Sequence, residues 1–264
     1  MKLAISNIAW TVSHDYEMLR YISQLGYNGL EIAPTRLYPN SPYDNIETAK
    51  TIVQGWQSKY NLTIPSMQSI WYGRNERLFG SRAERSNLLR YTMKAMDYAA
   101  AIGCQNLVLG SPKNRIIQDS GQYSLAVKFF EELASYAQSK KVVLLIEANP
   151  KTYGTNYINT TTEAFKLAGD VNLSGFKVNL DIGTMIQNHE SLTILSGYMT
   201  TINHVHISEP NLEPIIKRTL HHRLYELLAE AQYDGYISLE MKRPESIETV
   251  KSCAKYVKEV FDEC

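Results

Sequence analysis

The sequence has few cysteines and no excess of either charge. Its 264 residues include three cysteines, Cys104, Cys253 and Cys264, and no CxxC spacing. An odd number of cysteines without that spacing argues against a disulfide framework or a zinc knuckle. Lys and Arg number 27, as do Asp and Glu, so the formal net charge is zero. Nucleic-acid binders need a basic field to displace counterions from phosphates, so we expect no nucleic-acid partner.

Long apolar segments are also missing. No apolar run approaches the roughly 20 residues that a helix needs to cross a bilayer. The N-terminal run, KLAISNIAW, is short, contains Ser and Asn and is soon followed by His14 and Asp15. This pattern is unlike a secretory signal. We therefore expect a cytoplasmic protein without a membrane partner.

The sequence does contain a regular alternation of apolar runs and helical patterns. The strand-like runs lie at residues 2–10, 27–34, 62–72, 105–112, 141–150, 175–183, 203–208 and 236–241. Helical periodicity follows each of them, at residues 15–25, 46–60, 81–102, 122–140, 161–168, 191–199, 214–231 and 245–261. Strict alternation of this kind predicts an α/β fold with a parallel sheet covered by helices.

Eight strand–helix units over this length favour a single (β/α)8 TIM barrel over an open doubly wound sheet. No GxGxxG follows the first run, and GxxxxGK[ST] is absent. A nucleotide-binding open sheet therefore lacks its main sequence support. No Gly/Ser-rich or Pro-rich linker divides the chain, so we predict one domain over residues 1–264.

Four side chains that can bind metal stand at the ends of apolar runs. They are Glu147, Asp181, His206 and Glu240. TIM barrels place their active sites at the C-terminal ends of the strands, so these four are expected to meet at one mouth. A single buried acid there could be a structural ion pair or a helix cap. All four together predict a metal site, and three carboxylates with one imidazole suit a hard divalent ion.

Other residues at the strand ends are candidates for binding substrate. The two aromatic ones, Trp10 and Trp71, are expected to pack either against a sugar face or against the barrel rim. Lys113, together with Arg115, is expected to receive a phosphate or a carboxylate, or else to be a solvated loop charge. The remaining candidates are Glu31, Gln68 and Glu209. For Glu31 a salt bridge at the rim is the alternative.

Strand periodicity adds two residues below the predicted metal site. Asn179 and His204 come two positions before Asp181 and His206, so they are expected to face inward one layer down. We expect His204 to be either a core histidine or a partner that orients a ligand.

With these residues in this order, the whole chain resembles the sugar phosphate isomerase/epimerase branch of the xylose-isomerase-like (AP endonuclease family 2) TIM-barrel superfamily. Its members carry a Glu after strand five, D-x-x-H after strand six, HxH after strand seven and a Glu after strand eight. The matching segments here are Glu147, Asp181 in DIGT, His206 in HVHISE and Glu240 in LEM. Similarity to ketose 3-epimerases implies that these four residues hold one divalent ion, Mn2+, Co2+ or Mg2+ and less commonly Zn2+. It also implies that Glu147 and Glu240 form the acid/base pair.

Two residues of the family pattern are absent. Thr184 stands where D-x-x-H has its His, and SEPNLEP replaces the segment in which ketose 3-epimerases carry an Arg. The expected ligands are therefore complete, whereas residues that contact a ketose are not. The sequence supports the metal site more strongly than it supports any one reaction at that site.

The residues and the resemblance together predict a metal-dependent isomerase or epimerase of a small sugar or sugar phosphate. A divalent ion can stabilise an enediolate while one carboxylate removes a proton and the other returns one. The alternatives are a lyase like inosose dehydratase and a barrel that binds carbohydrate without turnover. An enzyme like endonuclease IV would need further His ligands and a basic surface, and the chain has six His. The resemblance also implies that the chain associates with copies of itself.

Overall fold

The computed structural model describes residues 1–261, so Cys264 lies outside the described residues. The strands are β1 Lys2–Ser6, β2 Gly29–Glu31, β3 Ser66–Met67, β4 Asn106–Leu109, β5 Val143–Glu147, β6 Phe176–Asp181, β7 Ile202–Ile207 and β8 Tyr236–Leu239. The α-helices are α1 Asp15–Leu25, α2 Pro34–Leu37, α3 Ile46–Tyr60, α4 Arg82–Ala101, α5 Tyr123–Lys140, α6 Thr161–Val171, α7 Ile182–Gln187, α8 Thr219–Glu230 and α9 Ile247–Phe261.

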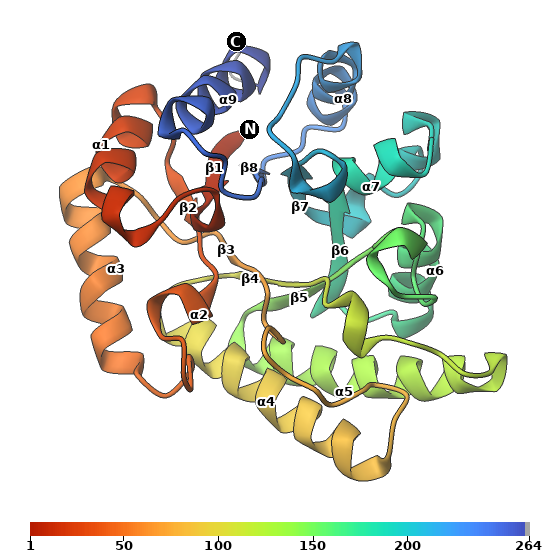
Figure 1. The fold of residues 1–264 in the computed structure, drawn as a ribbon. Helices are drawn as coiled ribbons and strands as arrows, with labels where there is room; N and C mark the ends of the chain where they lie inside the picture. The colour runs from red at the N-terminus through yellow and green to blue at the C-terminus, as the bar shows by residue number, and fades with distance from the viewer. Residues whose placement is uncertain (262–264) are drawn as a thin grey trace.

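The strands form one parallel sheet in the order β2-β1-β8-β7-β6-β5-β4-β3, with helices around it (Figure 1). Isolated parallel bridges, Gly29 with Thr63 and Ile32 with Met67, join the segments of β2 and β3. The sheet therefore closes on itself. The predicted (β/α)8 TIM barrel is confirmed.

Local chemistry at the helix ends explains several of these bounds. Gly26 ends α1 with φ 94°, a left-handed conformation that glycine adopts at little cost. Ser81 and Thr160 open α4 and α6 with reciprocal capping boxes to Glu84 and Glu163. Among the described residues, no helix is both long enough and apolar enough to span a membrane.

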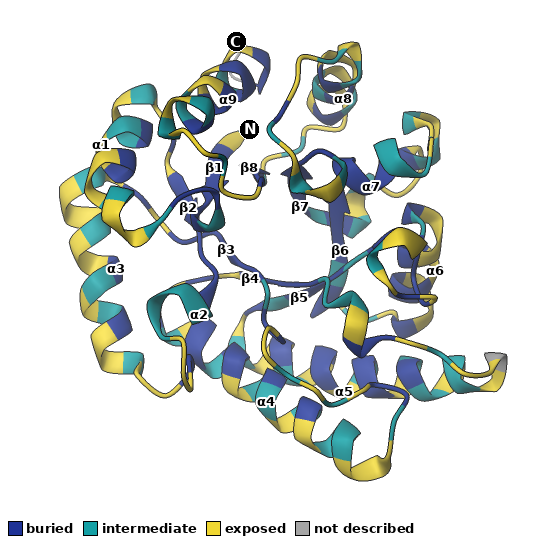
Figure 2. Cartoon of the chain, viewed as in Figure 1, coloured by how far each residue is buried: buried dark blue, intermediate teal, exposed yellow. Residues whose placement is uncertain are grey.

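The barrel has an apolar outer layer and a polar interior. Figure 2 shows buried residues on the strands and on the helix faces turned toward them, with exposed residues on the outside. The apolar residues of this layer include Val178, Leu180 and Val205, each at most 1% exposed. Polar side chains at most 1% exposed also occur along the strands, namely Ser6, Glu31, Ser66, Asn179, His204, His206 and Ser238. Hydrogen bonds connect several of these side chains, such as Ser66 with Glu31 at 2.6 Å and Ser6 with Gln68 at 2.9 Å.

Several predicted elements are shorter in the structure, among them the first strand, which ends at Ser6 before Trp10, and two others differ more strongly. The third strand spans only Ser66–Met67, so Trp71 lies beyond it. The helix expected at residues 191–199 is wrong, because β6 leads directly into α7 at Ile182. Asp181 accepts a hydrogen bond from the backbone N–H of Thr184 and so caps the helix there. Short 3-10 turns at Leu192–Leu195 and Met199–Thr201 occupy the predicted region.

The close contact of β2 with its neighbours gives a prediction about Gly29. An added Cβ would lie 2.8 Å from the Cβ of Ala4 and 2.7 Å from the ring of Tyr236. We expect Gly29→Ala to reduce the free energy of unfolding by about 1–3 kcal/mol, through overpacking. Gly55→Ala is the control, because its Cβ would meet nothing within 4 Å in α3. That variant should gain about 0.5–1 kcal/mol in urea unfolding. Equal free energies of unfolding for the Gly29→Ala and Gly55→Ala variants would contradict the packing argument.

Candidate metal centre

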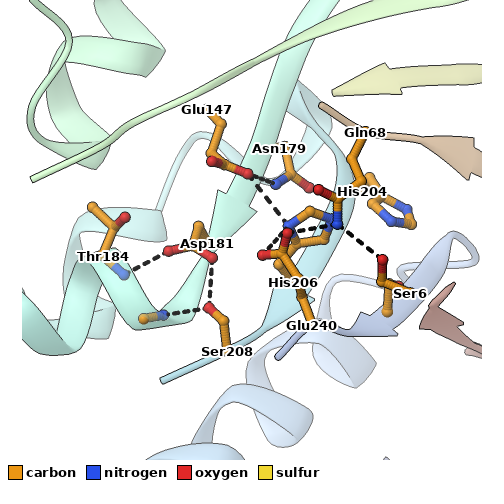
Figure 3. Close-up of polar contacts among 12 residues, drawn as sticks. Ser6, Gln68, Glu147, Asn179, Asp181, Thr184, His204, His206, Ser208 and Glu240 are labelled. Carbon is orange, nitrogen blue, oxygen red and sulfur yellow. Dashed lines mark hydrogen bonds and ion pairs between the residues drawn. The ribbon is translucent and has the colours of Figure 1, made fainter. Parts of the chain in front are cut away.

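The four predicted ligands lie together at the C-terminal ends of four adjacent strands. One ligand atom from each of Glu147, Asp181, His206 and Glu240 lies within 4.8 Å of the others (Figure 3). Asp181 and His206 are paired across β6 and β7. Glu147 ends β5, and Glu240 follows β8 directly. The parallel register of four strands is therefore what gathers side chains that are distant in sequence.

Side-chain amides hold the two glutamates. Asn149 donates from Nδ2 to Glu147 Oε1 at 2.8 Å, and Asn179 donates from Nδ2 to Glu147 Oε2 at 2.8 Å. Gln68 donates from Nε2 to Glu240 Oε1 at 2.6 Å. Each carboxylate is thus oriented by groups that leave further lone pairs available to a ligand.

Asp181 is held from two sides. The backbone N–H of Thr184 donates to Oδ1 at 2.6 Å, and the Ser208 hydroxyl donates to Oδ2 at 2.5 Å. The Ser208 oxygen itself accepts the backbone N–H of Gly183 at 2.8 Å. Asp181 is therefore a helix cap and also a member of the cluster, and these two roles are compatible because a carboxylate has about four acceptor sites.

His206 connects the cluster to the barrel interior. Its Nε2 lies 3.0 Å from Glu31 Oε2, and its Nδ1 lies 3.3 Å from Glu147 Oε2 and 3.1 Å from Glu240 Oε2. Nδ1 is buried and has no hydrogen-bond partner of acceptable geometry, although both carboxylates are close. An unpartnered nitrogen that faces three acids fits a divalent cation, which these four side chains would hold.

Burial and mutual repulsion disfavour negative charge on two acids of the cluster. Burial raises the pKa of Asp181 to about 7, with further contributions from the charges of Glu147 and Glu240. Burial also raises the pKa of Glu240. Burial acts the same way on Glu147, but the nearby His206 ring and the hydrogen bonds from Asn149 and Asn179 lower its pKa below the usual value. Burial opposes a positive charge on His206, but the neighbouring carboxylates of Glu31, Glu240 and Glu147 raise its pKa, with Glu31 contributing most. A bound cation would supply the positive charge that protons supply here.

The cluster opens into a small cavity of about 250 Å3. All three acids of the cluster line this cavity, and Tyr153 and Leu212 line it from the loops after β5 and β7. The side chains that line it include no Lys or Arg. A larger hollow of about 670 Å3 lies beside Tyr123 and Lys166, but none of the four clustered ligands lines it.

Of the residues predicted to bind substrate, Gln68 and Glu209 line the cavity. Glu209 is 4% exposed and accepts a bidentate ion pair from Arg218, with Nε to Oε1 at 2.7 Å and a terminal nitrogen to Oε2 at 2.5 Å. Its negative charge is thus largely compensated within the protein.

The structure places both tryptophans away from the cavity. Trp10 is 3% exposed, and its Nε1 donates to Asp15 Oδ1 at 2.8 Å. Trp71 is 1% exposed, and its Nε1 donates to Thr92 Oγ1 at 2.8 Å in α4. Because β3 ends at Met67, the chain carries Trp71 outward among the helices. Both rings are buried and neither lines the cavity, which agrees with the packing role among the two alternatives expected for them.

The predicted charged contacts also lie elsewhere. Glu31 is fully buried in the barrel interior and does not line the cavity, so a substrate contact or an exposed rim salt bridge does not fit. Lys113 is exposed and does not line the cavity either. Arg115 is fully buried, and donates to the backbone oxygen of Glu147 at 3.1 Å and to Asn149 Oδ1 at 2.6 Å. Burial lowers the pKa of Arg115 to about 10. Arg115 therefore stabilises the loop after β5, and the alternative of a solvated loop charge does not hold for it.

Some residues of the site were missed at the level of sequence. Asn149 and Ser208 come two positions after Glu147 and His206, so period-two reasoning carried past the strand ends would have found them. Tyr153 and Leu212 come from loops that have no such period. Tyr153 Oη accepts the backbone N–H of Asn211 at 2.6 Å, which joins the two loops beside the cavity.

Thr184, at the position of the family His, is turned away from the cavity. It is 1% exposed and donates from Oγ1 to the backbone oxygen of Ala148 at 2.9 Å. It is not among the residues that line the cavity. The substrate contact that a His would make there has no counterpart in this side chain.

Comparison with known proteins agrees with this architecture. Residues 19–260 match the family model described as Xylose isomerase-like TIM barrel, and the chain belongs to that family. Comparison with curated protein sequences finds no match.

Solved structures with the same fold include several sugar enzymes. An Escherichia coli 3-keto-D-glucoside 4-epimerase has 20% identity and a TM-score of 0.79, over 98% of this chain and 99% of that one. A D-psicose 3-epimerase from Clostridium cellulolyticum H10, solved with D-tagatose, has 19% identity and a TM-score of 0.80, over 100% of both chains. A sugar phosphate isomerase/epimerase from Parabacteroides distasonis has 12% identity and a TM-score of 0.74, over 98% and 92%. At these identities the likeness establishes the fold.

The raised pKa of Asp181 predicts how the metal-free protein responds to pH. The folded chain holds this proton to about pH 7, whereas the usual pKa of an aspartate side chain is 3.8. The contribution of this bound proton to the free energy of unfolding is therefore lost as the pH rises from about 4 to about 7. We expect Asp181→Asn to raise the Tm in chelator at pH 8, and to raise it less at pH 5.

Saturating Mn2+ provides the control for this measurement, because the Asn variant should then gain less stability than the parent. If Asp181→Asn raised the Tm in chelator equally at pH 5 and at pH 8, the assignment of a raised pKa to Asp181 would be contradicted.

Proposed function

We propose that this protein is a divalent-metal-dependent isomerase or epimerase of a small, unphosphorylated sugar. The observation that carries the proposal is the convergence of three carboxylates on the unpartnered Nδ1 of His206 beside a cavity. The names of the sugar epimerases that share the fold support the same reaction class.

The four clustered residues would hold the cation, which would supply a Lewis acid for neighbouring oxygens of the substrate. Glu147 and Glu240 remain the acid/base pair in this proposal. They line the same cavity from β5 and from the segment after β8. One removes the proton next to the substrate carbonyl, and the other delivers a proton to the opposite face of the planar intermediate.

The amides around the two glutamates keep them in place for this exchange. Glu147 is restrained through both oxygens by Asn149 and Asn179, whereas Glu240 is restrained through Oε1 by Gln68. Proton transfer requires an approach of about 2.6–3.2 Å between heavy atoms, so restraint of each carboxylate favours the reactive geometry.

The size and charge of the cavity support a small neutral substrate. Its volume of about 250 Å3 is below the roughly 300–1,000 Å3 that is typical of sites for drug-sized ligands. A phosphate would need a cationic or N–H-rich partner. The side chains that line the cavity include no Lys or Arg, Arg218 is paired with Glu209, and Arg115 is engaged by backbone and amide oxygens. These features favour a free monosaccharide over a sugar phosphate.

Metal content tests the first half of the proposal. We expect protein purified without chelator and supplied with Mn2+ to retain a single ion per chain, and Asp181→Ala/His206→Ala to retain none. Glu209→Gln is the matched control, because it alters an acid in the same cavity outside the cluster. If the parent binds none of Mn2+, Co2+, Mg2+ and Zn2+, the proposed mechanism fails. A non-catalytic carbohydrate-binding barrel then becomes the better explanation.

Solvent exchange tests the second half. With free ketoses in D2O, the parent should exchange the proton next to the carbonyl. We expect Glu147→Gln and Glu240→Gln to slow the exchange by about 10²–10⁴-fold, because each removes a proton-transfer group. Mn2+ occupancy measured under assay conditions separates lost chemistry from a lost ion. A product that has lost water would instead identify a lyase. Full exchange in both variants would contradict the acid/base roles.

A further inference from the structure

Glu31 makes the densest set of polar contacts in the barrel interior. Its Oε2 lies 2.6 Å from Ser66 Oγ, 3.1 Å from His204 Nε2 and 3.0 Å from His206 Nε2. The side chain is fully buried. Three partners from two other strands therefore meet on a single carboxylate oxygen.

The second oxygen of Glu31 has weaker contacts. Gln68 Nε2 and Ser238 Oγ each lie 3.4 Å from Oε1. Because a buried carboxylate is costly unless it is paired and hydrogen-bonded, a purely structural role would be served more cheaply by an apolar side chain. Glu31 lies directly behind His206, a candidate metal ligand, which suggests that the buried carboxylate acts on that ligand.

We infer that Glu31 is a positioning residue that fixes the tautomer and the ring orientation of His206. The Glu31 carboxylate can only accept a hydrogen bond at 3.0 Å, so Nε2 is an N–H of His206. A cation held at the cluster would take the place of any proton on Nδ1, and the Nε2–H bond to Glu31 then leaves the lone pair of Nδ1 directed at that cation. Carboxylates that accept the distal N–H of a metal-binding His act in this way. The inference rests on the proposed function because it requires the ion to bind at that cluster.

Ser66 and His204 stabilise Glu31 in this role. His204 is fully buried, and its Nε2 lies 3.1 Å from both the Ser66 hydroxyl and Glu31 Oε2. The rings of His204 and His206 meet edge to face, with centroids 5.3 Å apart. The carboxylate is thus held between two imidazoles, and it cannot rotate away from His206 without losing the contact with His204.

A second ion at this trio is the competing explanation, since Glu31, His204 and His206 also offer ligand atoms within 4.8 Å of one another. All three side chains are fully buried, and the Ser66 hydroxyl already contacts the shared oxygen. An ion on Nε2 of His206 would also require that nitrogen to lose its proton while Nδ1 binds the first ion. The geometry therefore favours a hydrogen bond here.

The first test compares Glu31→Gln with Ser238→Ala by calorimetric titration of the full-length chain with Mn2+. Either orientation of the Gln amide weakens the restraint: an amide N–H2 toward Nε2 favours the wrong His206 tautomer, and a neutral oxygen there is a poorer acceptor. We expect the Mn2+ Kd to rise about 10–100-fold. Ser238→Ala removes only the contact at 3.4 Å, so its Kd should stay within about threefold of the parent.

A second measurement needs no variant and so remains informative if Glu31→Gln does not fold. Nitrogen-15 NMR of the parent loaded with Zn2+ should show His206 with a proton on Nε2 and with Nδ1 shifted by the metal. The reverse tautomer would overturn the inference, as would an unchanged Kd in a folded Glu31→Gln variant. Two Zn2+ per chain would overturn it in favour of a second site. A parent that binds no ion would instead contradict the proposed function itself.

Discussion

The site depends on the two opposite contacts of one imidazole ring. His206 Nε2 meets Glu31 in the barrel interior, and Nδ1 meets three acids at the mouth. Without a positive charge on Nδ1 or between the acids, this arrangement would place four carboxylates around one ring at high electrostatic cost. Burial, together with the charges of Glu147 and Glu240, raises the pKa of Asp181 to about 7, and a bound cation would neutralise the same negative charges. The four strand ends and the polar interior therefore form a single unit.

The polar interior departs from the branched apolar layers that commonly fill TIM barrels. Here Asn179 supports Glu147, and Gln68 connects Glu240 with Ser6 and comes within 3.4 Å of Glu31. Such a network is favourable only when nearly every member is satisfied. The apolar helix–strand layer outside it supplies the burial that offsets its cost. The outward faces of the short strands therefore contribute apolar burial, and their inward faces carry the side chains of the site.

The sequence was sufficient for the barrel and for the four clustered residues, because alternating elements and strand ends are local patterns. It was insufficient for Trp71 and Glu31. Trp71 was misplaced since the length of β3 depends on tertiary pairing, which ends it at Met67. Glu31 was misplaced since only the closed barrel shows that its side chain meets His204 and His206 across the interior. The contact between Tyr153 and Asn211 joins two loops without periodicity, so no pattern in the chain predicts it.

The most direct test of the central claim is an anomalous difference map from crystals grown with Mn2+. The account predicts one peak, bounded by Glu147, Asp181, His206 Nδ1 and Glu240, with coordination that leaves room for a ligand in the cavity. A peak on the Nε2 side of His206, against Glu31 and His204, would contradict the account. So would the absence of any peak at Mn2+ concentrations that saturate the protein in solution.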